Sequence, residues 1–295
     1  MLHMAGLAVT TSQLRDRYLP LIKSRQTILL AFTGIAGYLC QPPVHLDWLR
    51  FTGLAISLVL TISGCTVLNM LFDRDIDCKM ERTSQRPLAS GRVSPSSAAI
   101  LGCGFLTVGL LWAAILSLPY FGVILSGAFL NVVVYTLWLK RRTAWSILGG
   151  GVAGGMPILA GRVLAIGRLD LLGLLMTLLI VCWIPSHNLA LSMLYSTDYL
   201  HAGIPTVLNR YGARLAHFLM AFSSFVVSII ILLVFNRLGF HGLLLGLLIT
   251  LSLGLVSLAV ISWVNPRRNL VVALYKFSSL YLLVSTLLLL FSGMM

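Results

Sequence analysis

The chain has 295 residues, of which 58% are hydrophobic and only 10% are charged. About a quarter of the residues are charged in a typical soluble domain, so this composition argues against a water-soluble fold. The formal net charge is +13, because 21 lysines and arginines stand against only 8 aspartates and glutamates. Half of these rare acids lie close together in the chain, and they are Asp73, Asp75, Asp77 and Glu81.

Nine apolar segments approach or exceed the roughly 20 residues that a helix needs to cross a bilayer core of about 30 Å. Segments of this kind cross lipid as helices, because each must satisfy its own backbone polar groups. We therefore predict an all-α integral membrane protein, with about nine transmembrane helices in a single polytopic domain over residues 1–295. The expected spans are 26–41, 50–72, 96–117, 120–139, 145–165, 170–193, 214–236, 241–263 and 270–293.

The basic residues predict how these helices are oriented. With the N-terminus inside, 17 of the 21 lysines and arginines lie on the inner side of the membrane. This asymmetry follows the positive-inside rule and predicts a cytoplasmic N-terminus in a prokaryotic cell membrane. The positive charge is thus mainly a topology signal rather than a nucleic-acid footprint, and we expect no nucleic-acid partner.

Two of the inner connections are long and polar, at residues 73–95 and 194–213. They are four spans apart, which suggests two related four-helix halves that each contribute one polar loop. A glycine-rich segment at 149–157 opens the fifth span. Small residues let membrane helices approach closely, so we expect tight helix packing there, with a backbone kink that lines a cavity as the alternative.

The acidic cluster contains the spacing N-x3-D-x3-D, formed by Asn69, Asp73 and Asp77. Residues four apart share one face of a helix, so these three side chains are expected to point the same way. Magnesium prefers oxygen ligands and usually takes one or two carboxylates together with phosphate oxygens and water. The spacing predicts a Mg²⁺ ion that bridges to a diphosphate, and a solvated acidic helix end is the alternative.

Basic side chains follow on the same inner side, at Arg82, Arg86 and the triplet Lys140, Arg141 and Arg142. Arginine grips phosphate oxygens in a bidentate manner, whereas lysine acts as a point charge. A departing diphosphate gains negative charge and needs such partners. We predict that these residues bind the diphosphate, although topology or lipid headgroups would also account for any single one.

The second half of the sixth expected span contains Pro185, with Trp183 and His187 on either side. Proline interrupts the helical hydrogen-bond ladder and can expose carbonyl groups to a cavity. An ionisable side chain at this depth is a functional candidate, so His187 is either an acceptor-binding residue or a hydrogen-bonded structural histidine. Asp198, the one acid of the following inner loop, is expected to complete the metal site.

Taken together, these motifs resemble the UbiA superfamily of intramembrane aromatic prenyltransferases, and most closely its protohaem IX farnesyltransferase branch. The resemblance covers about residues 18–210. The motifs that carry it are Lys23-Ser24-Arg25, Asp73-Arg74-Asp75-Ile76-Asp77 with Glu81-Arg82-Thr83 and Arg86-Pro87, Tyr135-Thr136 with Lys140-Arg141-Arg142, Trp183-Ile184-Pro185-Ser186-His187, and Asp198-Tyr199 with Ala202-Gly203-Ile204-Pro205.

The resemblance implies a helical bundle around a lipid-accessible cavity. It implies that Asn69, Asp73 and Asp77 hold Mg²⁺ on an isoprenoid diphosphate and that Asp198 belongs to a second acidic site. Farnesyl diphosphate, protohaem IX and membrane lipid are the expected partners, with transfer to a haem vinyl group as the reaction. His187 and Trp183 are the candidates for contact with the acceptor.

Two other functions remain open from the sequence. Another prenyltransferase of this superfamily would use a quinone precursor, a chlorophyll-type molecule or a lipid as its acceptor. A secondary transporter would place ionisable groups near the bilayer midplane at broken helices. The position of His187 within an expected span fits a transporter, whereas the position of the acids at the inner edge of the membrane does not.

Overall fold

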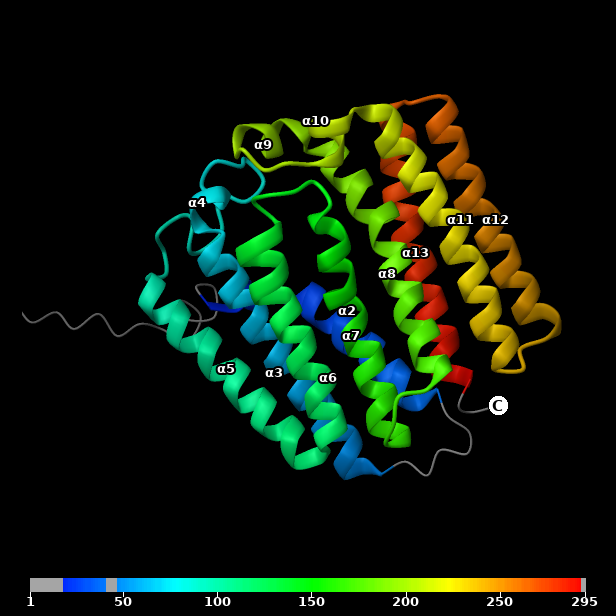
Figure 1. Cartoon of the computed structure of the whole chain (residues 1–295), viewed down its shortest axis with the longest axis horizontal. Coiled ribbons are helices and arrows are strands. Elements are labelled where there is room, and N and C mark those ends of the chain that lie inside the picture. The colour runs from blue at the N-terminus through cyan, green and yellow to red at the C-terminus, as the bar shows by residue number, and fades with distance from the viewer. Residues whose placement is uncertain (1–17, 41–46, 293–295) are drawn as a thin grey trace, which may run out of the picture.

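The computed structural model describes residues 18–40 and 47–292, and every regular element in these ranges is a helix (Figure 1). The predicted inner residues Arg15 and Arg17 lie outside this part of the chain, as do residues 41 and 293, the expected ends of the first and the ninth spans. The long helices are α2 (Ser24–Leu39), α3 (Trp48–Phe72), α5 (Pro95–Leu116), α6 (Leu118–Phe129) with its continuation η2 (Leu130–Leu139), α7 (Ser146–Ile166), α8 (Leu171–Leu194), α11 (Ala213–Arg237), α12 (Gly242–Val264) and α13 (Arg268–Ser292).

Eight helices in the described residues are long and apolar enough to cross a membrane, with α6 and η2 counted as one. They correspond to eight of the nine expected spans. The first expected span is α2, whose 16 residues give a length of about 24 Å, less than a bilayer core. The protein is therefore a multi-pass integral membrane protein, as the composition predicts, with a shorter first helix packed into the bundle.

The glycines of α7 bring three helices into close contact. A Cβ atom at Gly155 would lie 2.9 Å from the side chain of Thr177 in α8. One at Gly161 would overlap the carbonyl oxygen of Gly34 in α2. The expected close packing is thus confirmed, because only glycine lets these backbones approach so far.

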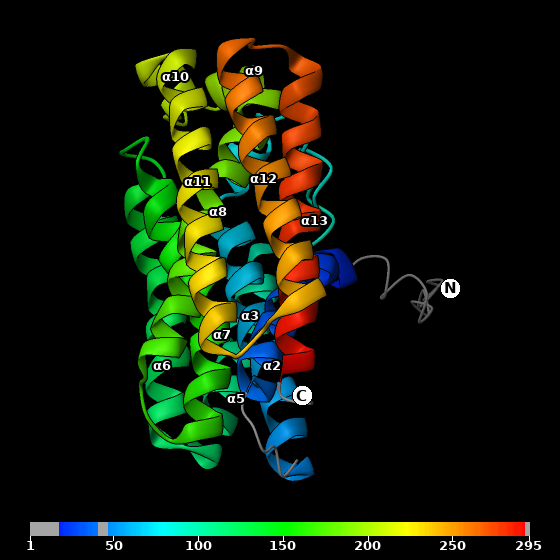
Figure 2. The same ribbon diagram turned by 90° about the vertical axis from the view of Figure 1, so that its right-hand side faces the viewer.

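Both long polar connections lie at one end of the bundle (Figures 1 and 2). The first contains the short helix α4 (Arg74–Asp77), and the second contains α9 (Ser196–His201) and α10 (Val207–Tyr211). Ile76 and Met80 of the first connection pack against Ala202 and Ile204 of the second. This small apolar cluster fixes the two loops to each other. Two loops more than a hundred residues apart in the chain therefore form one surface above the bundle.

A partly buried ion pair connects the helices near the opposite end. Arg162 of α7 lies 2.7 Å from Asp170, which caps α8, and it also donates to the carbonyl oxygen of Cys40 at the end of α2. Partial burial opposes ionisation of Asp170, but the hydrogen bonds from Arg162 bring the pKa of this carboxyl below its ordinary value. One arginine thus satisfies polar groups from two neighbouring helix ends.

Replacing this arginine is expected to destabilise the bundle. Arg162→Met leaves a partly buried carboxylate and a buried carbonyl without their donor, so we expect a loss of about 3 kcal/mol of unfolding free energy. Thermal unfolding in detergent measures the loss. Arg50→Met, which removes the exposed ion pair with Asp47, is the matched control and should change stability by less than about 1 kcal/mol. Equal effects of the two changes would contradict this role.

Candidate active site

The acidic motif lies at the junction between α3 and α4. Helix α3 ends at Phe72, and Asp73 has a backbone conformation (φ −89°, ψ 2°) between the two helices. The four-residue hydrogen bonding nevertheless continues, from Asp73 N to Asn69 O at 2.9 Å and from Asp77 N to Asp73 O at 2.8 Å. The break therefore leaves the N-x3-D-x3-D spacing in helical register.

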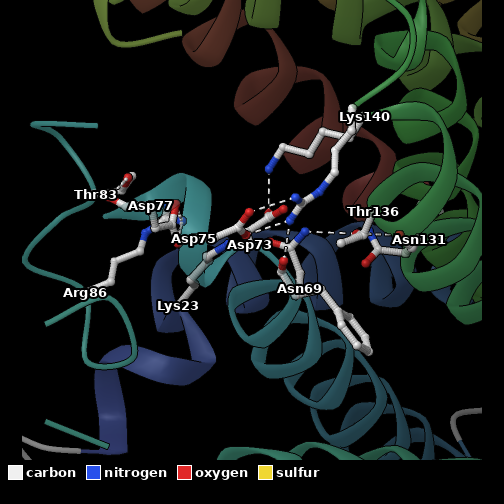
Figure 3. A network of polar contacts seen from close by, with 12 residues as sticks. Lys23, Asn69, Asp73, Asp75, Asp77, Thr83, Arg86, Asn131, Thr136 and Lys140 are labelled. Carbon is white, nitrogen blue, oxygen red and sulfur yellow. Dashed lines mark hydrogen bonds and ion pairs between the residues drawn. The ribbon is translucent and has the colours of Figure 1, made fainter. Parts of the chain in front are cut away.

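A π-helix carries the residues opposite this motif. The expected span 120–139 is an α-helix only to Phe129, and η2 then follows with bonds between residues five apart, as from Lys140 N to Tyr135 O. In this geometry Thr136 accepts a hydrogen bond of 3.0 Å from Asn69 Nδ2 (Figure 3). Thr136 in turn donates to the carbonyl of Asn131. Such π segments are frequent at functional sites, and no pattern in the sequence predicts this one.

Each buried acid of the motif has a basic partner. Asp73 is completely buried and lies 2.5 Å from Lys140 Nζ. Asp77 is also buried, and Arg86 Nη1 lies 2.8 Å from both of its carboxylate oxygens. Figure 3 shows these side chains converging from α4, the following loop and the end of η2. The two acids of the motif are thus each paired with a residue predicted to bind the diphosphate.

Lys23 is a further basic residue of the site. Its Nζ donates to Asn69 Oδ1 at 3.2 Å, from a backbone with φ of 45° between η1 (Leu19–Ile22) and α2. Among the described residues it is the one non-glycine with positive φ, a strained conformation of the kind found at functional sites. Burial, followed by the charges of Arg86 and Lys140, lowers the pKa of Lys23 to about 7. In the sequence this lysine is a topology signal and part of the family resemblance, and nothing there indicates its role in the site.

The donor atoms of the site suit magnesium shared with a diphosphate. Asp73 Oδ1 is buried and has no hydrogen-bond partner, and the neighbouring Asn69 offers an amide oxygen. No three His, Cys, Asp or Glu side chains in the described residues lie close enough to hold a metal ion by themselves. Magnesium usually binds through one or two carboxylates and completes its shell with water and phosphate oxygens. The residues therefore fit Mg²⁺ once a diphosphate supplies part of its coordination.

The remaining basic residues divide into two groups. Arg82, Arg86 and Lys140 line the central cavity, whereas Arg141 forms a two-pronged ion pair with exposed Asp75 and donates to the carbonyl of Phe72. This pair lowers the pKa of Asp75. Arg142 is exposed and does not line the cavity. Of the predicted triplet, the structure brings only Lys140 to the acidic motif, while Arg141 attaches the end of η2 to the end of α3.

Asp198 approaches the site from the second polar loop. Its carboxylate is buried and accepts a hydrogen bond of 3.2 Å from the backbone amide of Arg82. The guanidinium of Arg82 lies over the ring of Tyr195, 5.2 Å from its centre. Asp198 itself is not part of the cavity wall, but the adjacent Tyr199 is. The structure thus joins Asp198 to the loop that carries the predicted phosphate ligands.

A cavity of about 700 Å³ extends from this polar cluster into the bundle. Its walls come from α2, α3, α6, η2, α7, α8 and α13, and the side chains away from the polar end are mostly apolar. Glycines of α7, including Gly150 and Gly154, form part of the wall. The glycine-rich segment therefore both packs helices and lines the cavity, and it does so within the continuous helix α7.

An aromatic stack lies on the α8 side of this cavity. His187 is stacked between Trp183 and Tyr275 of α13, with ring centres 4.5 Å apart in both pairs. Its Nδ1 lies 3.2 Å from the hydroxyl of Ser278, whose carbonyl accepts from Trp183 Nε1. All three rings line the cavity. The sequence does not predict a role for Tyr275, because nothing in α13 distinguishes it and the stack forms only when α8 and α13 pack.

The proline of α8 does not break the helix, contrary to the prediction. α8 continues from Leu171 through Leu194, with Pro185 inside it. Ser223 of α11 satisfies the disturbed backbone, because its hydroxyl donates to the carbonyl of Cys182 and accepts from the amide of Ser186. A neighbouring helix thus removes the need for a break, and His187 lies on a continuous helix.

The sequence model of the UbiA prenyltransferase family matches residues 30–292 of the chain. The chain belongs to this family. It is 35% identical to protoheme IX farnesyltransferase of Desulforudis audaxviator (strain MP104C), over 90% of this chain and 85% of that protein. The corresponding protein of Korarchaeum cryptofilum (strain OPF8) is 38% identical over 88% of this chain and 87% of its own length.

Solved structures of the family share the fold. A structure of digeranylgeranylglyceryl phosphate synthase has a TM-score of 0.80 at 18% identity, covering 95% of this chain and 99% of the other. A UbiA homolog from Archaeoglobus fulgidus bound to GPP and Mg²⁺ has a TM-score of 0.70 at 17% identity, covering 93% and 99%. The UbiA resemblance predicted from the sequence motifs is confirmed by the family model and the sequence relatives, and the solved structures confirm the fold.

Proposed function

We propose that this protein transfers the farnesyl group of farnesyl diphosphate to a vinyl group of protohaem IX in a Mg²⁺-dependent reaction. The relatives named protoheme IX farnesyltransferase support the substrates. The structural observation that carries the proposal is the fully buried Asp73, with one carboxylate oxygen on Lys140 and the other unpartnered. It lies directly behind Asn69 and Lys140, which line the polar end of a mostly apolar cavity. This arrangement suits the ionisation of an allylic diphosphate next to a hydrophobic space.

The proposed division of labour follows from the site's charges. Asn69, Asp73 and Asp77 would hold Mg²⁺ near the diphosphate, with Asp198 at a second acidic site, and bound Mg²⁺ would supply Lewis-acid stabilisation of the leaving group. As the carbon–oxygen bond breaks, negative charge develops on the diphosphate and is stabilised by the cations Lys23, Arg82, Arg86 and Lys140. Arg141 and Arg142 add positive potential from outside the cavity. The apolar walls keep water from the allylic cation until the acceptor's vinyl π electrons attack it. The attack forms the new carbon–carbon bond and leaves a carbocation beside the porphyrin ring, which then takes up water and loses a proton to give the hydroxyethyl group.

The stack of Trp183, His187 and Tyr275 is proposed to hold the flat acceptor. Aromatic side chains offer a large apolar surface with a preference for offset stacking. Tyr275→Ala is expected to raise the KM for protohaem about tenfold while leaving the KM for farnesyl diphosphate nearly unchanged. Steady-state kinetics with each substrate varied in turn measure the two values. Tyr275→Phe keeps the ring and serves as the control, so an equal loss in both variants, or a loss confined to farnesyl diphosphate, would contradict acceptor binding.

We further propose that the polar end of the bundle faces the cytoplasm of a prokaryotic cell, as the excess of basic residues there indicates. The end that carries α4, α9 and α10 would then receive the water-soluble diphosphate head (Figure 1). We also propose that residues 1–295 form a single polytopic domain built from two related four-helix halves, because one polar loop follows the second expected span and the other follows the sixth.

The reaction is tested by incubating membranes that contain the protein with Mg²⁺, protohaem and farnesyl diphosphate and examining the haem by mass spectrometry. The expected result is a hydroxyethylfarnesyl haem that disappears when EDTA is added. Diphosphate release with prenylation of a hydroxybenzoate, but not of haem, would replace the acceptor and retain a UbiA-type prenyltransferase. Absence of Mg²⁺-dependent diphosphate release with every acceptor would contradict the enzymatic function and favour a transporter.

A further inference from the structure

The cavity has a direction that two neighbouring helices define. On α3 its lining begins at Asn69, beside the polar cluster, and ends at Leu58. On η2 and α6 it runs in the same sense from Tyr135 to Ile124. Figure 1 shows both helices descending from the end that carries α4. Leu58 and Ile124 are therefore the lining residues of α3 and α6 that lie furthest from the diphosphate end.

Packed side chains close the cavity beyond these two residues. Leu58 and Ile124 are 0% and 5% exposed and belong to one apolar cluster with Tyr120. Behind them the hydroxyl of Tyr120 lies 2.7 Å from that of Ser57, and both residues are completely buried. Neither Ser57 nor Tyr120 lines the cavity. A hydrogen-bonded layer thus backs the packed side chains of Leu58 and Ile124.

The depth of the cavity can be measured along α3. Leu58 lies 11 residues before Asn69, which corresponds to about 16 Å at the rise of an α-helix. An isoprene unit contributes four chain bonds of about 1.5 Å and spans about 5 Å when extended. Three units need about 15 Å and a fourth brings the chain to about 20 Å. An isoprenoid chain that starts beside Asn69 therefore reaches Leu58 and Ile124, the floor of the cavity, with its third unit.

We propose that Leu58 and Ile124, supported by the Tyr120–Ser57 hydrogen bond, are the residues that set the isoprenoid chain length. The proposal rests on the proposed prenyl transfer and adds to it the residues that select the donor. A fourth unit would have to displace buried side chains from a packed cluster, whereas two units would leave the lower part of the cavity empty. Both cases lose contacts that a chain of three units makes, because interiors are packed closely.

Variants at the floor test the proposal. Leu58→Ala and Ile124→Ala deepen the cavity, so each is expected to raise the kcat/KM ratio of geranylgeranyl over farnesyl diphosphate by about tenfold or more. Ala128→Phe places a ring one helical turn above Ile124, on a residue that also lines the cavity. It is expected to shift the preference by about tenfold or more towards geranyl diphosphate. Product masses from mixtures of the three donors give the ratios directly.

The matched control is Leu164→Ala, which removes the same atoms from the same apolar cluster at a position that does not line the cavity. It should lower stability without changing the donor ratio. An unchanged ratio in all three floor variants, or a change as large in Leu164→Ala, would overturn the proposal. If the wild-type chain prenylates no acceptor, the proposed function fails instead. The floor is then tested by binding of the three diphosphates, and it is supported if Leu58→Ala tightens only geranylgeranyl diphosphate and overturned if it does not.

Discussion

Asp73→Asn is expected to lower Mg²⁺-dependent turnover by at least about a hundredfold, the scale seen when one electrostatic contact to a developing charge is removed. Asp73 is the completely buried member of the acidic motif, and its Oδ1 has no hydrogen-bond partner. The amide of asparagine keeps the shape of the side chain but supplies no charge to a cation. The expected signature is a loss that is only partly recovered by raising the Mg²⁺ concentration. Initial rates of diphosphate release across a Mg²⁺ titration measure it.

Asp75→Asn is the matched control for this prediction. It makes the same chemical change two residues away, on an exposed side chain that is paired with Arg141 and does not line the cavity. Its activity should stay within about twofold of the wild type, because exposed ion pairs contribute little. If Asp75→Asn loses as much activity as Asp73→Asn, the acidic segment acts as a general negative surface and the proposed metal site is wrong.

The membrane fold was accessible from the sequence because its signal is long and repeated. Apolar segments near 20 residues have one solution in lipid, so eight spans were predicted close to their observed positions. The remaining element, α2, also lies within two residues of its expected span 26–41, but its 16 residues are fewer than a helix needs to cross a bilayer core. Packing against the glycines of α7, rather than span length, determines where this helix lies.

The site was predictable where neighbours in the chain share a helix face and not where distant segments meet. Asn69, Asp73 and Asp77 follow from a spacing of four, and their backbone register is as expected. The outward turn of Arg141 could not be predicted, because adjacent basic residues look alike until the end of η2 is placed against α3. Tyr275 likewise becomes recognisable only through its packing on His187.

The ion pairs of the site also explain why its acids are stable while buried. A carboxylate removed from water is costly unless a cation compensates it. Lys140 compensates Asp73 and Arg86 compensates Asp77. The same cations are those a diphosphate would attract, so the site is held together by groups that its substrate can share. A basic residue here therefore has two functions, and substitution should reveal both.

Lys140→Met is expected to lower kcat/KM for farnesyl diphosphate by about a hundredfold, because a buried cation at the polar end of the cavity is lost. The same change leaves Asp73 without its counter-charge, so the carboxylate should attract Mg²⁺ more strongly and the Mg²⁺ concentration at half-maximal rate should fall. Opposite shifts for the two ligands distinguish phosphate binding from simple damage to the fold, which would weaken both. Steady-state rates with each ligand varied at a fixed concentration of the other provide the measurement.

Arg141→Met is the control that makes this result interpretable. It removes a cation from the adjacent residue, but the lost contacts are to exposed Asp75 and the Phe72 carbonyl rather than to the cavity. It should leave the half-maximal Mg²⁺ concentration unchanged and alter kcat/KM by no more than a few-fold, since its ion pair is exposed. Should saturating Mg²⁺ restore full activity to Lys140→Met, the lysine would serve only to neutralise Asp73, and its proposed contact with the diphosphate would be refuted.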